Sequence, residues 1–276
     1  MFSWIRVSSL AVLFAAFFVL PSQAQNTEQL QVGPPPVHRV DPPPPEASPE
    51  QLEQRGDDLR ADKNWLDALD YYQASLKGAP GNASLLNRMG ICQIQLHRLR
   101  ESKKTLERAV RIDHRFADAY NNLGVVYYET GVLYHSSSDF SRAIKLYDKA
   151  IALSAEFASY YNNRGAAYFA QKRYEHAAAD YSTALQLDPD VFERTAKAGV
   201  QAMLPSPEDR ARYEYVVAKL YAKMGVTDRS LHYLRKAMED GYKGIKDVYK
   251  DNEFSTLRKD PRFAELMATK TLAISD

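Results

Sequence analysis

One spacing constrains the fold of this chain more than any other feature of its sequence. Small residues recur 34 positions apart, each inside a segment with helical periodicity. The recurring residues are Gly56 and Gly90, Ala68 and Ser102, and Ser75 and Ala109. Such fixed offsets are typical of sites where the two helices of a hairpin cross closely, because a larger side chain would hold the backbones apart. The spacing therefore predicts repeated helix pairs.

The same register continues through two more copies, the first of which carries an insertion. Gly124 and Gly165 are 41 positions apart, whereas Ala143 and Ala177 are again separated by 34. Seven extra residues therefore lie between Gly124 and Ala143, at about 132–138.

The insertion has a predicted geometry and two interpretations. Seven residues make two helical turns, so we expect the first helix of this copy to run on by ~10 Å. Ser138 or Asp139 is expected to cap the helix that follows. Insertions in repeat proteins often lie on a functional face, and tolerated surface variation is the alternative.

The fourth copy contains an ordered series of aromatic and small residues. They are Tyr161, Gly165, Tyr168, Tyr174, Ala177, Tyr181, Ala184 and Pro189. This order resembles the tetratricopeptide repeat (TPR). The second copy departs furthest from it, with Gln93, Ser102 and His114 where Tyr, Ala and Pro are usual. The four copies are expected at 49–82, 83–116, 117–157 with the insertion, and 158–191, together 49–190.

The resemblance implies an all-α fold. The fold that this resemblance implies is a right-handed superhelical solenoid of antiparallel helix pairs. Beyond Val191 the register is lost, although the helical character continues through 191–272. We expect an extra helix at Val191–Leu204, then Pro207–Met224 and Asp228–Glu239 as an irregular fifth repeat. A capping tail follows, in which Phe254, Leu257, Phe263 and Leu266 cover the last apolar face.

The first residues have the layout of an export signal. Arg6 precedes an apolar run of 14 residues, Val7–Leu20, and small residues precede a cleavage position after Ala24. The run is shorter than the ~20 residues that a membrane-spanning helix needs. We therefore expect 1–24 to be a cleaved signal peptide and the protein to be exported, either periplasmic or secreted. The alternative is an uncleaved N-terminal anchor.

A proline-rich stretch separates this signal from the repeats. Eight of the 14 prolines lie between Gly33 and Pro49, a composition typical of an extended polyproline II spacer. We expect 25–48 to be a disordered linker, and a docking ligand for a proline-binding module or for wall material is the alternative. Ser48 and Gln51 predict a capping box at the start of the first repeat helix.

The charge balance and the single cysteine exclude several classes of function. A net charge of +1 does not build the positive field that phosphate backbones need, so no nucleic-acid partner is expected. Cys92 has no second thiol with which to form a disulfide, and we expect it to be buried in a repeat helix. The sequence contains no nucleophile motif, phosphate-binding loop or zinc-ligand spacing. We therefore expect no catalytic residues, cofactor or metal.

The resemblance also implies where a partner binds. In such repeats the first helices line a concave groove that holds segments of partner proteins. The candidate groove residues are Arg88, Ile91, Asn122, Val125, Tyr128, Asn163 and Phe169. For Tyr128 and Phe169, packing within the repeats is the alternative. Asn122 and Asn163 occupy equivalent places, and an amide both donates and accepts. They either grip a partner's backbone or bond the neighbouring repeat.

A binding mode known in the family is not expected here. The carboxylate clamp needs Lys and Asn where this chain has Glu53 and Asp57, so Arg88 alone is left as a partner for a carboxylate. The sequence predicts a non-catalytic scaffold of the cell envelope that binds a polypeptide in the groove. An accessory factor of envelope biogenesis acting on wall polymer is the alternative.

Overall fold

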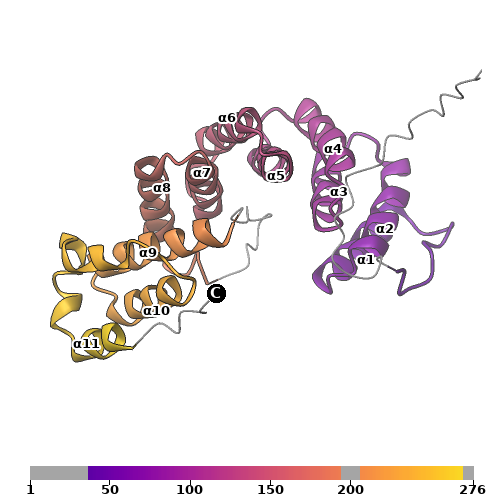
Figure 1. The fold of residues 1–276 in the computed structure, drawn as a ribbon. Helices are drawn as coiled ribbons and strands as arrows, with labels where there is room; N and C mark the ends of the chain where they lie inside the picture. Colours follow the sequence, from indigo (N-terminus) through magenta and orange to yellow (C-terminus); the bar gives the residue numbers. More distant parts are fainter. Residues whose placement is uncertain (1–36, 194–205, 270–276) are drawn as a thin grey trace, which may run out of the picture. The chain divides into compact units, whose positions relative to one another are not determined.

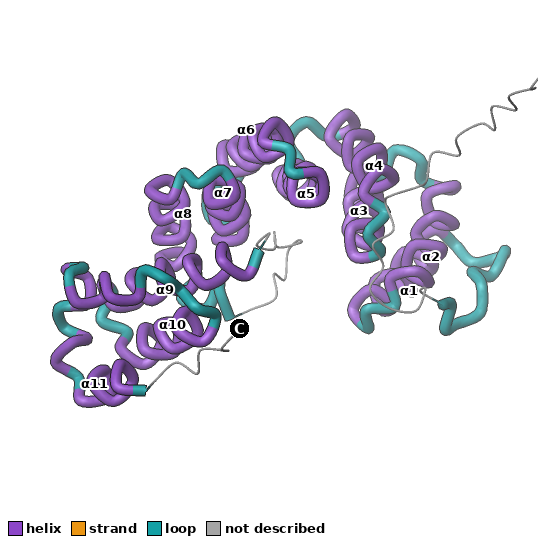
Figure 2. The backbone as a smooth tube through the Cα atoms, viewed as in Figure 1, coloured by secondary structure: helices purple, strands orange, loops and turns teal. Residues whose placement is uncertain are grey.

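The computed structural model describes residues 37–193 and 206–269 as helices joined by short turns (Figures 1 and 2). No strand occurs in these two ranges. Eight helices lie in the first range: α1 Pro49–Ala61, α2 Trp65–Gly78, α3 Ala83–Gln95, α4 Leu99–Ile112, α5 Ala117–Tyr134, α6 Ser137–Leu153, α7 Ala158–Ala170 and α8 Tyr174–Leu187. Consecutive helices pack as pairs (Figure 1). The predicted all-α solenoid of helix pairs is confirmed.

The second range contains one more helix pair and a short tail. Its elements are α9 Pro207–Lys223, α10 Thr227–Glu239, the 3-10 turns Ile245–Tyr249, Asn252–Phe254 and Leu257–Lys259, and α11 Pro261–Ala268. The four apolar residues predicted to cover the last face are all buried, and they join one cluster with residues of α9 and α10. They are Phe254, Leu257, Phe263 and Leu266. Their predicted sealing role is confirmed.

The predicted helix at Val191–Leu204 does not begin where we expected. Residues 191–193 form a turn, and 194–205 lie outside the described residues. The chain turns because the Asp188 carboxylate accepts the backbone N–H of Asp190 at 2.9 Å and the Asp188 carbonyl accepts that of Val191 at 3.0 Å. Val191 itself is buried in the core shared with α9 and α10.

The recurring glycines lie where the helices of each pair cross. A Cβ atom placed on Gly56, Gly124 or Gly165 would lie 2.6 Å from a tyrosine ring of the partner helix. The rings belong to Tyr72, Tyr147 and Tyr181, and Leu106 takes the same place opposite Gly90. No side chain fits there without moving its neighbour. The predicted close crossings are confirmed.

The insertion lengthens both helices of the third pair. α5 has 18 residues and α6 has 17, against 13 and 14 in the α7–α8 pair. His135 ends α5 in the left-handed region at φ 52°, and the Ser136 side chain then accepts the N–H of Asp139 at 3.3 Å. Ser136 is therefore the cap, and the predicted cap at Ser138 or Asp139 is wrong.

The capping box at the start of α1 is confirmed. Ser48 N–H donates to Gln51 Oε1 at 2.9 Å, and Gln51 N–H donates to Ser48 Oγ at 3.3 Å. These two bonds satisfy donors that the first helical turn leaves without partners.

Part of the proline-rich stretch is bound to α2. Arg39 N–H donates to the Asp67 carboxylate at 3.1 Å, and the Tyr71 hydroxyl donates to the Asp41 carbonyl at 3.2 Å. Val40 packs against the same core as α2. Residues 39–41 are therefore bonded to α2, although we expected 25–48 to be a disordered linker. Residues 25–36 of that linker and the predicted signal at 1–24 lie outside the described residues. Among the helices that are described, none is long and apolar enough to cross a membrane.

Candidate functional site

Charged side chains connect the first helices of repeats one and two. Arg88 of α3 donates from one guanidinium nitrogen to Glu53 Oε1 at 2.7 Å and to Asp57 Oδ2 at 2.8 Å, both on α1. Arg60 lies 3.6 Å from the other oxygen of Asp57. Two cations and two carboxylates balance within this cluster. Arg88 is therefore already paired, and this corrects our expectation that it is the residue left to bind a partner's carboxylate.

Asparagine side chains continue this connection through repeats three and four. Asn122 Nδ2 of α5 donates to Asn87 Oδ1 of α3 at 2.9 Å, and Asn163 Nδ2 of α7 donates to Asn121 Oδ1 of α5 at 3.0 Å. Asn121 in turn donates to Asn122 Oδ1 at 3.2 Å. The four amides form a chain from α3 to α7, which we call the asparagine chain.

The asparagine chain bears on our two interpretations of Asn122 and Asn163, which were a grip on the backbone of a partner and a bond to the neighbouring repeat. Asn122 and Asn163 are both 0% exposed, and each bonds the neighbouring repeat. A direct role in holding a partner stays a prediction. Asn87 and Asn121 were missed by the sequence reasoning, although the adjacent asparagines at 121–122 and 162–163 already indicated two amide positions per helix.

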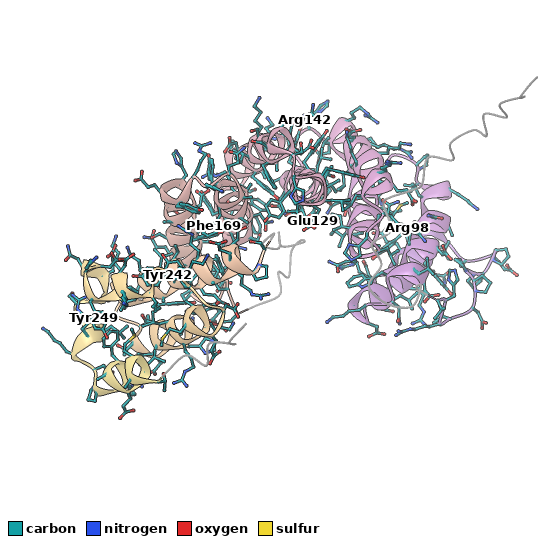
Figure 3. The ribbon with its side chains drawn as sticks, in the orientation of Figure 1. Arg98, Glu129, Arg142, Phe169, Tyr242 and Tyr249 are labelled. Atoms are coloured by element: carbon teal, nitrogen blue, oxygen red, sulfur yellow. The ribbon has the colours of Figure 1, made fainter. Side chains whose placement is uncertain are left out.

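Three further candidate residues also lie in the interior. Val125, Tyr128 and Phe169 are each 0% exposed. The structure therefore has the packing alternative for Tyr128 and Phe169, and the groove position expected for Val125 is wrong. Phe169 lies where α7 meets α9, with its ring centroid 6.4 Å from that of Tyr213 (Figure 3). Tyr128 packs against Phe140 of α6 at 5.6 Å, and burial raises the pKa of its hydroxyl. The physical reason is that Tyr128 packs against α6 and Phe169 against α9, while Val125 belongs to a buried apolar cluster with residues of α3, α4, α6 and α7.

The candidate groove residues that remain accessible lie on α3, which bonds to α1. Ile91 and Arg88 are partly exposed, and Gln54 and Gln95 are exposed. Together with Asp57 they form what we call the first-helix face. It presents two glutamine amides and one apolar side chain, next to a charge cluster that is internally balanced. Such a face can hydrogen-bond a peptide backbone and contact one apolar side chain.

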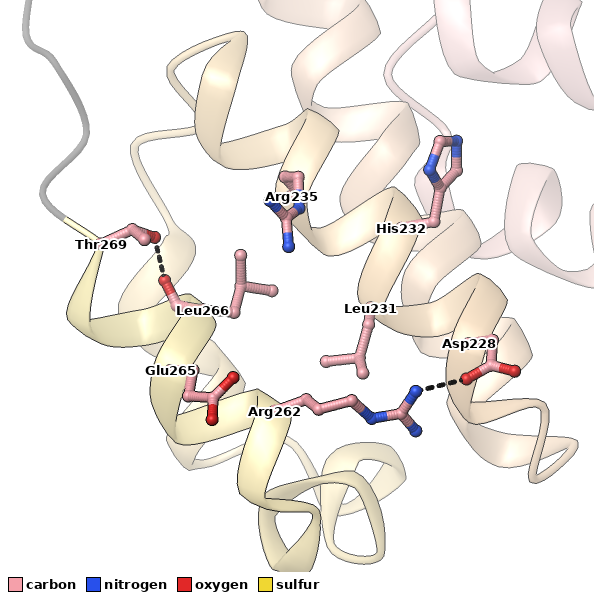
Figure 4. Close-up of a pocket in the computed structure, with 8 residues that line it drawn as sticks. All are labelled: Asp228, Leu231, His232, Arg235, Arg262, Glu265, Leu266 and Thr269. Carbon is pink, nitrogen blue, oxygen red and sulfur yellow. Dashed lines mark hydrogen bonds and ion pairs between the residues drawn. The ribbon is translucent and has the colours of Figure 1, made fainter.

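A separate pocket lies between α10 and α11 (Figure 4). Its volume is about 520 Å³. It is lined by Asp228, Leu231, His232, Arg235, Arg262, Glu265, Leu266 and Thr269. Arg262 is held by Asp228 and Asp260, each at 2.7 Å. Two leucines thus give the pocket an apolar part, and the rest of its lining includes both acidic and basic side chains. The pocket shares no residue with the predicted groove.

The single thiol lies in the interior of the repeats. Cys92 is buried as predicted, and burial raises its pKa to about 12. A protonated buried thiol is neither a nucleophile nor a metal ligand. No group of three His, Cys, Asp or Glu side chains in the described part of the chain is placed to hold a metal ion.

One buried carboxylate was not singled out by the sequence reasoning. Glu214 of α9 is 5% exposed, and its Oε2 atom has no hydrogen-bond partner. Burial, reinforced by the nearby Asp240, raises its pKa to about 7. Glu214 stands four residues before the small residue Ala218. In repeats one and four the equivalent position, four residues before Gly56 and Gly165, holds Leu52 and Tyr161, so a carboxylate here takes the place of an apolar or aromatic side chain.

Comparison with known proteins adds three family matches. Models described as tetratricopeptide repeat match residues 59–129 and 158–191, and one described as TPR repeat matches residues 131–172.

One curated relative and two solved structures illustrate the likeness. The inactive TPR repeat-containing thioredoxin TTL3 of Arabidopsis thaliana is 31% identical over 84 residues, which are 30% of this chain and 12% of that protein. This chain thus spans about an eighth of the length of that relative. The thermophilic TPR protein TTC0263 of Thermus thermophilus is 20% identical, with a TM-score of 0.51 over 80% of this chain and 99% of that chain. MamA from Desulfovibrio magneticus RS-1 is 13% identical, with a TM-score of 0.47 over 74% of this chain and 97% of that chain. The likeness to TTC0263 is one of fold.

Proposed function

This chain is a tetratricopeptide-repeat protein, and we propose that it is a non-catalytic scaffold that binds a partner polypeptide on the first helices of its repeats. TPR folds are typical of protein–protein interaction. Their partners are proteins or peptides.

One observation carries the proposal. The first helices α1, α3, α5 and α7 are joined side to side by the Arg88 ion pairs and by the asparagine chain. Fixed side-to-side bonds hold the exposed residues of neighbouring repeats at set distances. A surface arranged before the partner arrives loses less conformational entropy on binding, so the first-helix face is suited to a segment that spans more than one repeat.

The chemistry of the first-helix face suggests what it selects. Gln54 and Gln95 offer both donors and acceptors, while Ile91 offers an apolar contact. Arg88 and Asp57 neutralise each other. The face therefore favours an extended backbone with an apolar side chain over a strongly charged tail.

Site-specific crosslinking in cells tests this proposal. A photoreactive amino acid at Ile91 or Gln95 is expected to trap the same polypeptide, because both positions lie on the first-helix face. Gln186, which is exposed on the second helix α8, is the matched control and is expected to trap nothing in common with them. Equal trapping at Gln186, or no polypeptide at Ile91 and Gln95, would contradict the proposal.

The cellular location is proposed from the sequence alone. The short apolar run that ends at Leu20, followed by small residues up to Ala24, supports export with cleavage of the signal. The N-terminal residue of the protein purified from its natural source tests this. Gln25 is the expected residue, and Met1 or Phe2 would indicate an uncleaved anchor instead.

A further inference from the structure

The exposed side of α4 carries a continuous line of positive charge. Arg100, Lys104, Arg108 and Arg111 are all exposed and follow one another at intervals of four, four and three residues. Residues three or four apart lie on one side of a helix. At 1.5 Å per residue the line is ~16 Å long. We call these four residues the α4 basic face.

The α4 basic face points outward because the opposite side of the helix is buried against α3. Leu99, Leu106 and Ala109 are buried, and Leu106 contacts Gly90 of α3 in the first helix of the same repeat. The four cations therefore point away from the helix pair. Arg108 is held in place through a hydrogen bond to the Pro80 carbonyl at 2.5 Å.

Two of these four cations have no ion-pair partner among the residues that the structure describes. Neither Lys104 nor Arg111 forms an ion pair with any residue in the described ranges. Two carboxylates of α4 flank the line. Glu101 lies 3.9 Å from Arg98, and Glu107 stands three residues after Lys104 and four before Arg111 without forming an ion pair with a described residue. Because the whole chain has a net charge of only +1, the positive field is a local property of this helix and not of the molecule.

The corresponding helix of the fourth repeat shows that the fold does not require these cations. α8 contains no Lys or Arg between Tyr174 and Leu187, and its exposed residues include Glu175 and Gln186. The two helices have the same length of 14 residues. The charge of α4 therefore has no structural explanation in the repeat itself.

Basic residues also continue from α4 onto α6. Lys103 Nζ and Arg142 Cζ lie 4.9 Å and 5.7 Å from the centroid of the Tyr127 ring, which separates the two helices. Lys145 and Lys149 are exposed on α6. A partner that follows the α4 basic face thus meets further cations on the next repeat.

We propose that the α4 basic face is a second interaction surface, one that binds an acidic segment of a polypeptide. Guanidinium groups bind carboxylates through two parallel hydrogen bonds, and a line one helix wide fits a rod-shaped partner. A helix that lies in a bilayer surface buries apolar side chains in addition to pairing its cations with anionic lipid, but the one large apolar side chain that α4 exposes is Ile112, at its last residue. Binding of single-stranded nucleic acid relies on exposed aromatic rings for stacking, and α4 has no aromatic residue.

Charge reversal with a matched control tests this inference. The probe is a fluorescein-labelled peptide of about 20 residues with alternating Glu and Ser, titrated with the full chain and followed by fluorescence anisotropy. The variant is Lys104→Glu with Arg111→Glu. The control is Lys243→Glu with Lys246→Glu, which changes the net charge equally at two residues beyond α10. We expect the α4 variant to weaken binding by about tenfold and the control by less than about twofold.

Three further readouts keep the outcome clear. Thermal melts check that both variants stay folded, and Lys104→Gln with Arg111→Gln is expected to give an intermediate loss of affinity. Equal weakening by the α4 variant and the control would overturn the proposal, because only net charge would then matter. It would also be overturned if the wild-type protein ignored the peptide and bound a DNA duplex or vesicles with anionic lipid through Lys104 and Arg111. Crosslinking at Ile91 does not depend on any of these results. The proposal for the α4 basic face and the proposal for the first-helix face are therefore tested separately.

Discussion

The second and fourth repeats reach the same architecture with different residues. Their helices have matching lengths, 13 residues for α3 and α7 and 14 for α4 and α8. At the crossing, Gly165 meets a tyrosine ring whereas Gly90 meets Leu106. The alanine slot holds Ala177 in one repeat and Ser102 in the other. The buried Ser102 hydroxyl donates to the Gly90 carbonyl at 2.9 Å, so the polar replacement is satisfied locally.

The two repeats also end in the same turn without sharing the family's proline. Asp113 accepts the N–H of Arg115 at 2.8 Å, and Asp188 accepts the N–H of Asp190 at 2.9 Å. Asp side chains commonly close such turns by bonding the backbone two residues on. His114 can therefore stand where the fourth repeat has Pro189. The comparison teaches that these two repeats share the aspartate turn and the glycine crossing, and that α4 is free to carry charge on its outer side.

The largest expected difference between these repeats lies at the crossing. Tyr181→Ala should cost about 4 kcal/mol of unfolding free energy and Leu106→Ala about 3 kcal/mol, because a buried ring leaves the larger cavity. Tyr181 also loses its edge contacts with Phe192 and Tyr213, whose centroids lie 5.8 and 5.2 Å away. Urea titrations followed by circular dichroism measure both. A larger loss for Leu106→Ala would reverse this order and refute the packing argument.

A second prediction concerns the link between the repeats. Asn163→Ala should cost about 2 kcal/mol, because Asn121 Oδ1 is left without its buried donor. Asn162→Ala is the matched control, since the Asn162 side chain is also buried yet makes no hydrogen bond to another described residue. We expect a clearly smaller loss for it by differential scanning calorimetry. If both substitutions leave the melting temperature unchanged, the asparagine chain does not hold the repeats together.

A third prediction extends the comparison to the irregular fifth repeat. The pKa of Glu214 is raised to about 7, so its protonated form favours the folded state. This contribution is present below the ordinary pKa of 4.5 and is lost as the pH rises through 7. Glu214→Gln should therefore gain stability relative to the wild type by about 2 kcal/mol between pH 5 and pH 8.

Melting curves at both pH values measure that gain. Glu208→Gln, at an exposed residue of the same helix, serves as the control and should show no such trend. A gap between Glu214→Gln and wild type that narrows as the pH rises would give the wrong sign.

The smallest expected effect is at the alanine slot. Ser102→Ala should change stability by no more than about 1 kcal/mol, because the hydroxyl bond is lost while the methyl group still fits. The converse change, Ala177→Ser, should be similarly mild if a serine there can reach the Gly165 carbonyl as Ser102 reaches that of Gly90. Melting temperatures of the two variants check this. A loss of several kcal/mol at either site would show that the slot tolerates one residue only.

How much of this could be predicted from the sequence depends on the range of each contact. The glycine crossings were predictable, because the steric requirement repeats every 34 residues and is met within one pair. The cap of α6 was missed by two residues because it depends on the left-handed conformation of His135, which no periodicity shows. Burial of Asn122 and docking of Arg39 on Asp67 depend on neighbours 35 and 28 residues away. Such contacts become visible only when the repeats are placed against one another.

The most direct test of the account is the affinity of the polypeptide trapped at Ile91. Titration calorimetry would compare the wild-type protein with Ile91→Glu on the first helix of repeat two and Gln186→Glu on the second helix of repeat four. We predict that Ile91→Glu weakens binding by at least about tenfold, since it places a charge in the apolar contact. Gln186→Glu should leave it unchanged. Equal affinity for all three proteins would contradict the claim that the first helices hold the partner.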